Sequence, residues 1–116
     1  MPVRYSNSRV LKWPRAEEVI GALKHWADET VRERPEVLRI GYFGSYARGD
    51  WGVGSDLDVV IILKSSDLPF IERAAKWNTM EMPVAVDVLV YTETEWKGRM
   101  QSRGQFRDVV WIDDVN

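Results

Sequence analysis

The 116-residue sequence contains no cysteine. Disulfide bonds and zinc–thiolate sites are therefore excluded, and cysteine usage leaves the redox compartment unconstrained. The sequence also lacks an apolar run of the roughly 18 residues that a membrane span needs. Its first residues have no apolar stretch suitable for a signal peptide. We therefore expect a soluble, cytoplasmic protein with no membrane partner.

An excess of basic residues is also missing. The chain has 16 lysines and arginines against 18 acidic residues, which gives a formal net charge of -2. Such a chain has no overall positive field, so we expect no direct nucleic-acid partner. The length suits a single domain over residues 1–116. Residues 1–13 show no clear periodicity and are a candidate N-terminal arm.

Hydrophobic spacing and turn residues predict alternating helices and strands. Helices are expected over residues 15–34, 67–79 and 93–106, with a single helical turn over 45–48. The side chains expected to face inward from the second helix are Leu68, Ile71, Ala74 and Ala75. Thr92 and Glu95 form a capping-box signal before the last helix. Strands are expected over 37–43, 56–63, 84–91 and 109–112. The alternation predicts an α/β (α+β) fold, a small mixed β-sheet flanked by helices.

A glycine–serine pair follows the first expected strand. Gly44 lets the backbone approach a ligand closely, and a short helical turn after it would direct free N–H groups toward anionic oxygens. The hydroxyl of Ser45 can add a hydrogen bond to a phosphate. The same pair is common in ordinary turns, so the pair alone leaves both interpretations open.

Three aspartates carry a second signal. Asp56 and Asp58 lie two apart in an expected strand, so their carboxylates share a face and repel each other unless a cation lies between them. A solvated Asp-x-Asp pair is the alternative. Asp87 interrupts an apolar strand, where a charge is costly without an arginine, lysine or metal partner. If these strands are neighbours, the three carboxylates can hold two Mg²⁺ ions, an arrangement that assists nucleotidyl displacement.

Other side chains near these motifs have open roles. Arg48 either contacts a triphosphate or pairs with a nearby acid. Trp51 either stacks on a base, touches an acceptor, or covers apolar surface as a lid. His25 is the only histidine, and we expect it on the surface or in packing contacts of the first helix. The remaining tryptophans are expected in the core or at partner contacts.

The combined pattern of Gly44-Ser45, Asp56-x-Asp58 and Asp87 resembles the DNA polymerase-beta-like nucleotidyltransferase superfamily. The short chain is similar to the minimal nucleotidyltransferase (MNT) family within it. The likeness is strongest over residues 40–63 and extends more loosely to about Trp111. The resemblance implies a nucleotidyltransferase fold of the polymerase-beta palm type. It also implies transfer of an NMP group from an NTP, with release of pyrophosphate.

The resemblance also implies roles for the motif residues. The expected nucleotide-binding residues are Gly44, Ser45 and Arg48, of which the first two would hold the outer phosphates. The expected catalytic and metal-binding residues are Asp56, Asp58 and Asp87. The first two aspartates would bridge two Mg²⁺ ions, and the third would bind the catalytic ion and help activate the attacking oxygen. ATP is the expected donor.

The acceptor is implied only through the family's partners. Minimal members commonly accompany a helical HEPN-domain toxin, and as antitoxins they are thought to transfer AMP to a toxin tyrosine. Three hypotheses stay open for this chain. It is an AMP transferase acting on a HEPN toxin, a non-catalytic module that masks the toxin, or a small-molecule (aminoglycoside-type) nucleotidyltransferase. The last would act as half of a homodimer or hetero-complex.

Overall fold

The computed structural model describes residues 13–100 and 104–112. Its elements, in chain order, are α2 (Ala16–Glu33), β1 (Val37–Phe43), α3 (Ser45–Arg48), β2 (Leu57–Leu63), α4 (Phe70–Arg73), the 3₁₀ turn η1 (Ala74–Lys76), β3 (Val86–Thr92), α5 (Glu93–Met100), the 3₁₀ turn η2 (Gly104–Phe106) and β4 (Val110–Trp111). The predicted α/β class is confirmed. The candidate arm lies outside the described residues except for Trp13.

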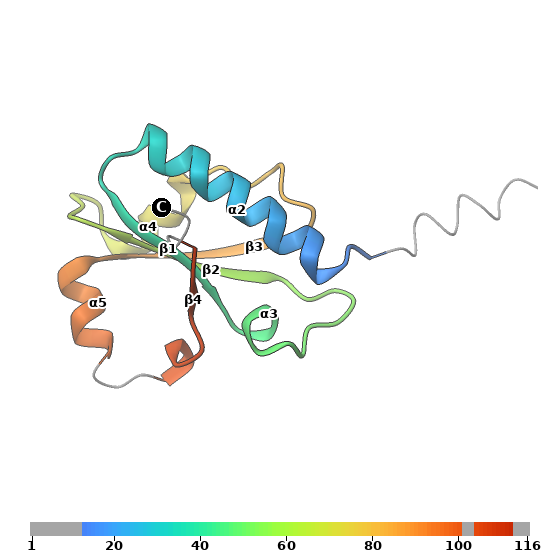
Figure 1. Cartoon of the computed structure of the whole chain (residues 1–116). Coiled ribbons are helices and arrows are strands. Elements are labelled where there is room, and N and C mark those ends of the chain that lie inside the picture. Colours follow the sequence, from blue (N-terminus) through green and yellow to red (C-terminus); the bar gives the residue numbers. More distant parts are fainter. Residues whose placement is uncertain (1–12, 101–103, 113–116) are drawn as a thin grey trace, which may run out of the picture.

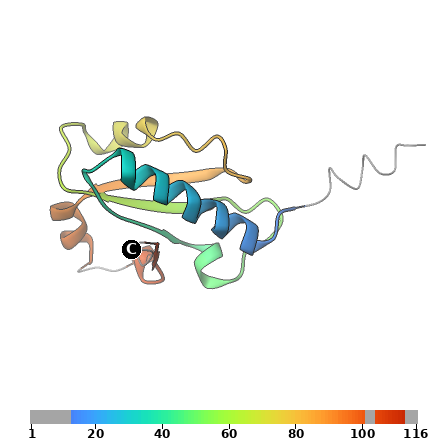
Figure 2. The same ribbon diagram turned by 45° about the horizontal axis from the view of Figure 1, so that its top comes forward.

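The four strands form one mixed sheet in the order β3-β2-β1-β4. β1 is antiparallel to both β2 and β4, and β3 is parallel to β2. A parallel pair needs a crossover connection, which here runs through α4 and η1. Figures 1 and 2 show α2 lying across one face of the sheet, while α5 lies on the other side. The sheet therefore has two different covers.

The core is divided between these two faces. Under α2, the buried helix residues pack with alternate strand residues, namely Val19, Leu23, Ala27, Leu57, Val59, Ile61 and Val90. On the opposite face, aromatic side chains gather around α5 and η2, namely Phe43, Tyr91, Trp96 and Phe106, with Val60 and Ile62. β2 contributes to both faces, which explains its unbroken apolar sequence after Asp58. Among the described residues, no helix has the length and apolarity of a membrane crossing.

The tryptophans and the histidine follow the expectations from the sequence. Trp77 and Trp96 are buried. The others, Trp13, Trp26, Trp51 and Trp111, are half-buried. His25 is exposed on α2, and its Nε2 lies 3.3 Å from Oε2 of Glu29 one turn later. The interpretation of His25 as a surface residue is confirmed.

The helix predicted over residues 67–79 is wrong in length and in its buried face. The α-helix begins only at Phe70, because Pro69 keeps the preceding residue out of helical geometry. Ile71 is 85 % exposed, and Arg73 faces inward instead. The extended backbone of Trp77 ends the following 3₁₀ turn. The expected inward set of Leu68, Ile71, Ala74 and Ala75 is therefore incorrect, because a buried guanidinium decides the orientation.

The last predicted helix, over residues 93–106, is also too long. α5 ends at Met100, and the chain forms a 3₁₀ turn from Gly104, whose φ of 37° departs from helical geometry. The predicted capping box is confirmed. The Thr92 N–H donates to Glu95 Oε1 (2.9 Å), and the Glu95 N–H donates to Thr92 Oγ1 (3.3 Å). The strands begin or end within two residues of their predicted bounds.

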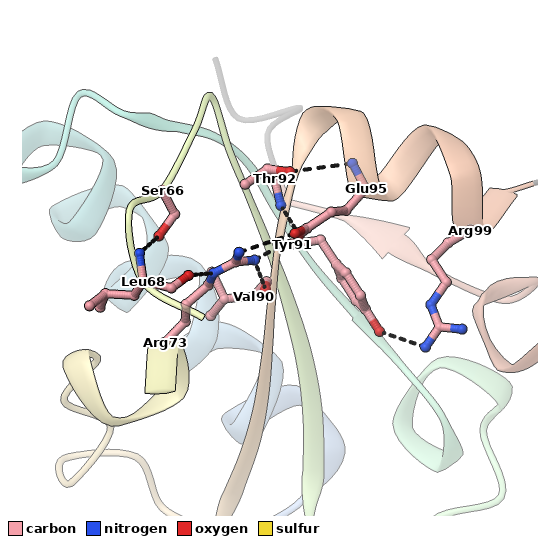
Figure 3. A network of polar contacts seen from close by, with 8 residues as sticks. All are labelled: Ser66, Leu68, Arg73, Val90, Tyr91, Thr92, Glu95 and Arg99. Atoms are coloured by element: carbon pink, nitrogen blue, oxygen red, sulfur yellow. Dashed lines mark hydrogen bonds and ion pairs between the residues drawn. The ribbon is translucent and has the colours of Figure 1, made fainter. Parts of the chain in front are cut away.

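A buried arginine joins the crossover connection to β3 and α5 (Figure 3). The Arg73 side chain is only 7 % exposed. Its Nη1 and Nη2 donate to the two carboxylate oxygens of Glu95, at 2.7 and 3.1 Å. Nε donates to the carbonyl of Leu68 and Nη1 also donates to the carbonyl of Val90. A bidentate pair of this kind fixes both partners in a defined orientation.

This network makes stability sensitive to acid. The hydrogen bonds from Arg73 hold the pKa of Glu95 down at about 2, against an ordinary value of 4.5. The stabilisation from ionised Glu95 is therefore complete above about pH 4.5 and is lost as the pH falls through about 2. In urea melts at pH 7, 4 and 2.5, wild type should exceed Glu95→Gln in stability at pH 7, and the gap should shrink toward pH 2.5. The exposed neighbour Glu93→Gln is the control, and an equal gap at every pH would contradict the assignment.

Candidate active site

The Gly44 turn begins where β1 ends. Gly44 has φ 77° and ψ -148°, a conformation that a side chain strongly disfavours. Its carbonyl accepts from the N–H groups of Ala47 and Arg48, both at 3.0 Å, which starts α3. The N–H groups of Ser45 and Tyr46 come before the first intrahelical bond, as at any helix start. The predicted helical turn at 45–48 is confirmed.

Strand register brings the acidic residues to the same end of the sheet. In the antiparallel β1–β2 pair, Phe43 lies opposite Asp58. Gly44 is the next residue after Phe43, so the glycine turn begins beside Asp58. In the parallel β2–β3 pair, Asp58 lies opposite Asp87. Paired residues project onto the same face, here the face that carries α5. The prediction that Asp87 lies beside Asp58 is confirmed by this register.

An open pocket of about 680 Å³ collects these groups. Its lining residues are Phe43, Gly44, Ser45, Arg48, Ser55, Asp56, Asp58, Asp87, Leu89, Gly104 and Asp108. All six residues predicted from the sequence to form the site are among them. A cavity of this size falls in the range that small-molecule ligands and nucleotides occupy. The pocket is therefore the candidate active site.

The electrostatics of the pocket centre on Asp58. Burial raises the pKa of this carboxyl, and the negative charges of Asp87 and then Asp56 raise it further, while Arg48 lowers it. Asp58 is half-buried, whereas Asp56 and Asp87 are exposed. The acids are thus close enough to repel one another, and a cation between them would remove that repulsion.

The donor chemistry of the pocket fits Mg²⁺. Carboxylate oxygens and a serine hydroxyl are hard ligands of the kind that this ion prefers. However, among the described residues no three histidine, cysteine, aspartate or glutamate side chains are already gathered into a metal-binding group. The exposed carboxylates of Asp56 and Asp87 would therefore have to turn toward Asp58 to share an ion.

Asp87 needs no cationic side chain to offset its charge. The sequence predicts a costly buried charge within an apolar strand, but the side chain is exposed at the rim of the pocket. The ion pairs found among the described residues do not include Asp87. The expected burial of this charge is therefore wrong, because the Asp87 side chain is exposed, and a metal partner for it stays a prediction.

The positions of Arg48 and Trp51 each favour one of the interpretations that the sequence left open. Arg48 lines the pocket, and its Nε and Nη2 donate to the carboxylate of Asp50 at 3.1 and 3.3 Å. The ion-pair interpretation is confirmed, while a contact with triphosphate stays a prediction. The ring of Trp51 stacks on Tyr46 with 5.4 Å between centroids and an interplanar angle of 5°. Trp51 therefore covers apolar surface.

Five residues that line the pocket were not predicted from the sequence to belong to the site, namely Phe43, Ser55, Leu89, Gly104 and Asp108. Gly104 and Asp108 come from the segment around η2. They reach the pocket because β4 pairs with β1, with Trp111 opposite Gly41. The sequence offered one signal for Asp108, namely its position just before the short closing strand. Its approach to the aspartates of β2 and β3 depends on a long-range strand pair that local patterns do not reveal.

Gly44 is predicted to tolerate no side chain. A Cβ at this position would collide with Oδ2 of Asp58, and φ is positive. Gly44→Ala should therefore cost about 1–3 kcal/mol of unfolding free energy and displace the Asp58 carboxylate. The control is Gly21→Ala in α2, where a Cβ meets nothing within 4 Å. That change should stabilise by about 0.5–1 kcal/mol. Equal effects of the two changes in urea melts would contradict this account.

The chain folds as an α/β domain with one mixed sheet. Its pocket places a glycine turn beside aspartates on two strands, and these groups fit phosphate and a divalent cation. The family model described as "Nucleotidyltransferase domain" matches residues 25–109, and the chain belongs to this family. The fold is similar to that of a candidate nucleotidyltransferase from Sulfolobus solfataricus solved by crystallography. The TM-score is 0.62 and the identity 23 %, over 87 % of this chain and 89 % of that one. No protein of curated function matches the chain.

Proposed function

We propose that the chain is a Mg²⁺-dependent nucleotidyltransferase that uses the Gly44–Asp58–Asp87 pocket. The observation that carries the proposal is the register that sets Gly44 and Asp87 on either side of Asp58 at one end of the sheet. Membership of the nucleotidyltransferase family supports the reaction class. The size and acidity of the pocket support a nucleoside triphosphate bound together with cations.

We assign each predicted site residue a role in the reaction from its position. Gly44 and Ser45 bind the outer phosphates with backbone N–H groups and the hydroxyl, and Arg48 lies beside them. Asp56, Asp58 and Asp87 would hold Mg²⁺, which supplies positive charge against the phosphates and acidifies the acceptor hydroxyl. The acceptor oxygen bonds to the α-phosphorus as the bond from that phosphorus to the oxygen between the α- and β-phosphates breaks. Pyrophosphate leaves with that electron pair, and the acceptor proton passes to Asp87.

We further propose that the donor is ATP and that the acceptor is a tyrosine of a HEPN-domain toxin, so that the chain acts as an antitoxin. The described residues form one sheet with its helices and contain no separate acceptor domain. The pocket is open rather than enclosed, so a protein side chain can enter it. This finer proposal depends on the resemblance of the motif to minimal nucleotidyltransferases.

The test combines the purified chain with a HEPN-domain protein encoded beside it, MgCl₂ and α-labelled ATP. We expect a covalent adduct of AMP mass on a tyrosine of the partner, and no adduct when EDTA is present. Loss of partner toxicity without any adduct would support the non-catalytic masking module instead. Labelling of an aminoglycoside acceptor but not the protein would support the small-molecule enzyme. Absence of Mg²⁺-dependent ATP binding by calorimetry would overturn nucleotidyl transfer itself.

A further inference from the structure

β3 is an edge strand of the sheet. Hydrogen bonds occupy the outward-facing backbone groups along one half of this strand but not along the other. The sheet order places β3 at one edge, with β2 as its neighbour. The N–H of Leu57 in β2 donates to the carbonyl of Ala85 at 2.9 Å, so the Ala85 carbonyl faces β2. Backbone groups alternate sides along a strand. Asp87 and Leu89 therefore turn their backbone groups toward β2, whereas Val86 and Val88 turn theirs outward.

Beyond Val88, this outer edge is closed by side chains. The outward carbonyl of Val90 accepts from Arg73 Nη1 at 3.1 Å, and the outward N–H of Thr92 donates to Glu95 Oε1 at 2.9 Å. Figure 3 shows both contacts in the same network, on the side of β3 where α4 lies. The Arg73–Glu95 pair thus occupies the backbone groups that an added strand would need there. It protects this half of the edge from pairing.

The half of the edge next to Asp87 stays open. In the described part of the chain, no side-chain hydrogen bond and no loop hydrogen bond involves the outward groups of Val86 or Val88. Both residues are only half-buried. An unpaired strand edge of this kind is a template for another extended chain. Its register is limited on one side by Arg73, so an added strand is confined to the end that carries Asp87.

We propose that this open edge, the backbone of Val86 and Val88, binds an extended segment of the acceptor protein as an added β-strand. The inference rests on the proposed nucleotidyl transfer. A residue of that segment opposite Asp87 would project onto the same face as Asp87 and Asp58, where the pocket opens. Neighbouring strands lie about 4.8 Å apart, so a long side chain such as tyrosine can extend over Asp87, whereas serine falls short.

Charge selects a partner segment over a second copy of this chain. Two copies that paired antiparallel through the same two outward residues would set Asp87 opposite Asp87 of the second copy. Like charges directly opposite each other destabilise a strand pair. Four aspartates line the pocket beside this edge. They favour a neutral or basic segment around the acceptor hydroxyl.

The test uses the full chain, Mg²⁺, α-labelled ATP and two pools of synthetic peptides. Each peptide has a central tyrosine with flanking residues of randomised sequence. The second pool carries N-methyl groups on the flanking amides, which prevents strand pairing without changing the protein. We expect labelling of the first pool, and labelling weaker by about tenfold in the second, because lost backbone hydrogen bonds lower affinity by that order.

A matched pair of variants tests the same edge from the protein side. Val88→Pro removes an outward N–H and leaves the ladder to β2 intact, as is tolerated on edge strands. Val88→Thr keeps the N–H. We expect Val88→Pro to lose labelling by about tenfold, with Mg²⁺-ATP binding unchanged by calorimetry, and Val88→Thr to label like wild type.

Two results would overturn the inference alone. They are equal labelling of the two pools and wild-type labelling by folded Val88→Pro. No labelling of either pool although ATP binds would contradict both the edge and the proposed tyrosine acceptor. Protection of the Val86 and Val88 amides without peptide, in a concentration-dependent dimer, would assign the edge to a second copy. By contrast, absence of Mg²⁺-dependent ATP binding by wild type would contradict the proposed function and not the edge specifically.

Discussion

Asp58→Asn is expected to lower nucleotidyl transfer by at least about 10³-fold while the fold is retained. Asp58 is the central acid of the pocket, flanked by Gly44, which directly follows β1, and by Asp87 on β3. A carboxylate that holds a catalytic cation contributes several kcal/mol to the transition state, which corresponds to about three orders of magnitude in rate. Asparagine has the same shape but cannot supply that charge.

The same substitution should not lower stability. The carboxylate of Asp58 is repelled by those of Asp87 and Asp56, and the neutral amide removes this repulsion. We therefore expect an unchanged or higher Tm together with the loss of activity, a combination typical of functional residues. The control is Asp67→Asn, an exposed acid outside the pocket, which should leave both quantities unchanged. Substantial activity in folded Asp58→Asn would remove the basis for the proposed site.

The largest loss of stability is expected from Arg73→Met. The change removes four hydrogen bonds, which leaves the buried carbonyl of Val90 without its guanidinium donor and the carboxylate of Glu95 without its cationic partner. Breaking a buried ion pair costs about 3–5 kcal/mol. Because the Glu95 side chain is 42 % exposed, we expect the lower end, about 3 kcal/mol, and a fall in Tm of about 10 °C.

A surface ion pair provides the comparison for Arg73. Arg32 and Asp28 form an exposed pair across one turn of α2. Arg32→Ala should cost less than about 0.5 kcal/mol, since solvent screens such pairs. Urea melts of Arg73→Met, Glu95→Gln and the double variant then give the coupling energy of the buried pair. Additive effects of the two single changes would show that the pair does not act as a unit.

The elements that bear the pocket are those that local sequence predicts well. β1, α3 and β2 match their predicted bounds within one residue, because apolar runs bounded by glycines specify short strands and turns. Asp58 and Asp87 could be paired from the sequence only on the condition that their strands are neighbours. The structure shows that β2 and β3 are neighbours. This pairing depends on the crossover connection between them, which hydrophobic periodicity does not predict.

The prediction fails where a single polar contact outweighs periodicity. Apolar spacing predicted that Ile71 faces inward, yet Arg73 turns α4 so that its guanidinium reaches Glu95. A buried, fully hydrogen-bonded arginine cannot be distinguished in the sequence from an exposed one. Asp108 was missed for a different reason, because its place in the pocket follows from the pairing of β4 with β1.

The order of strand pairing has a consequence for how the pocket is assembled during folding. Phe43 and Asp58, which meet across β1 and β2, are separated by a short stretch of chain, whereas Gly41 and Trp111 come from distant parts of it. Contacts between distant residues form slowly, because a long loop must first close. The Gly44–Asp58 half of the pocket should therefore form with an early hairpin. The side that carries Asp108 should be added last, so an early folding intermediate would contain the glycine turn and a carboxylate but not the completed pocket.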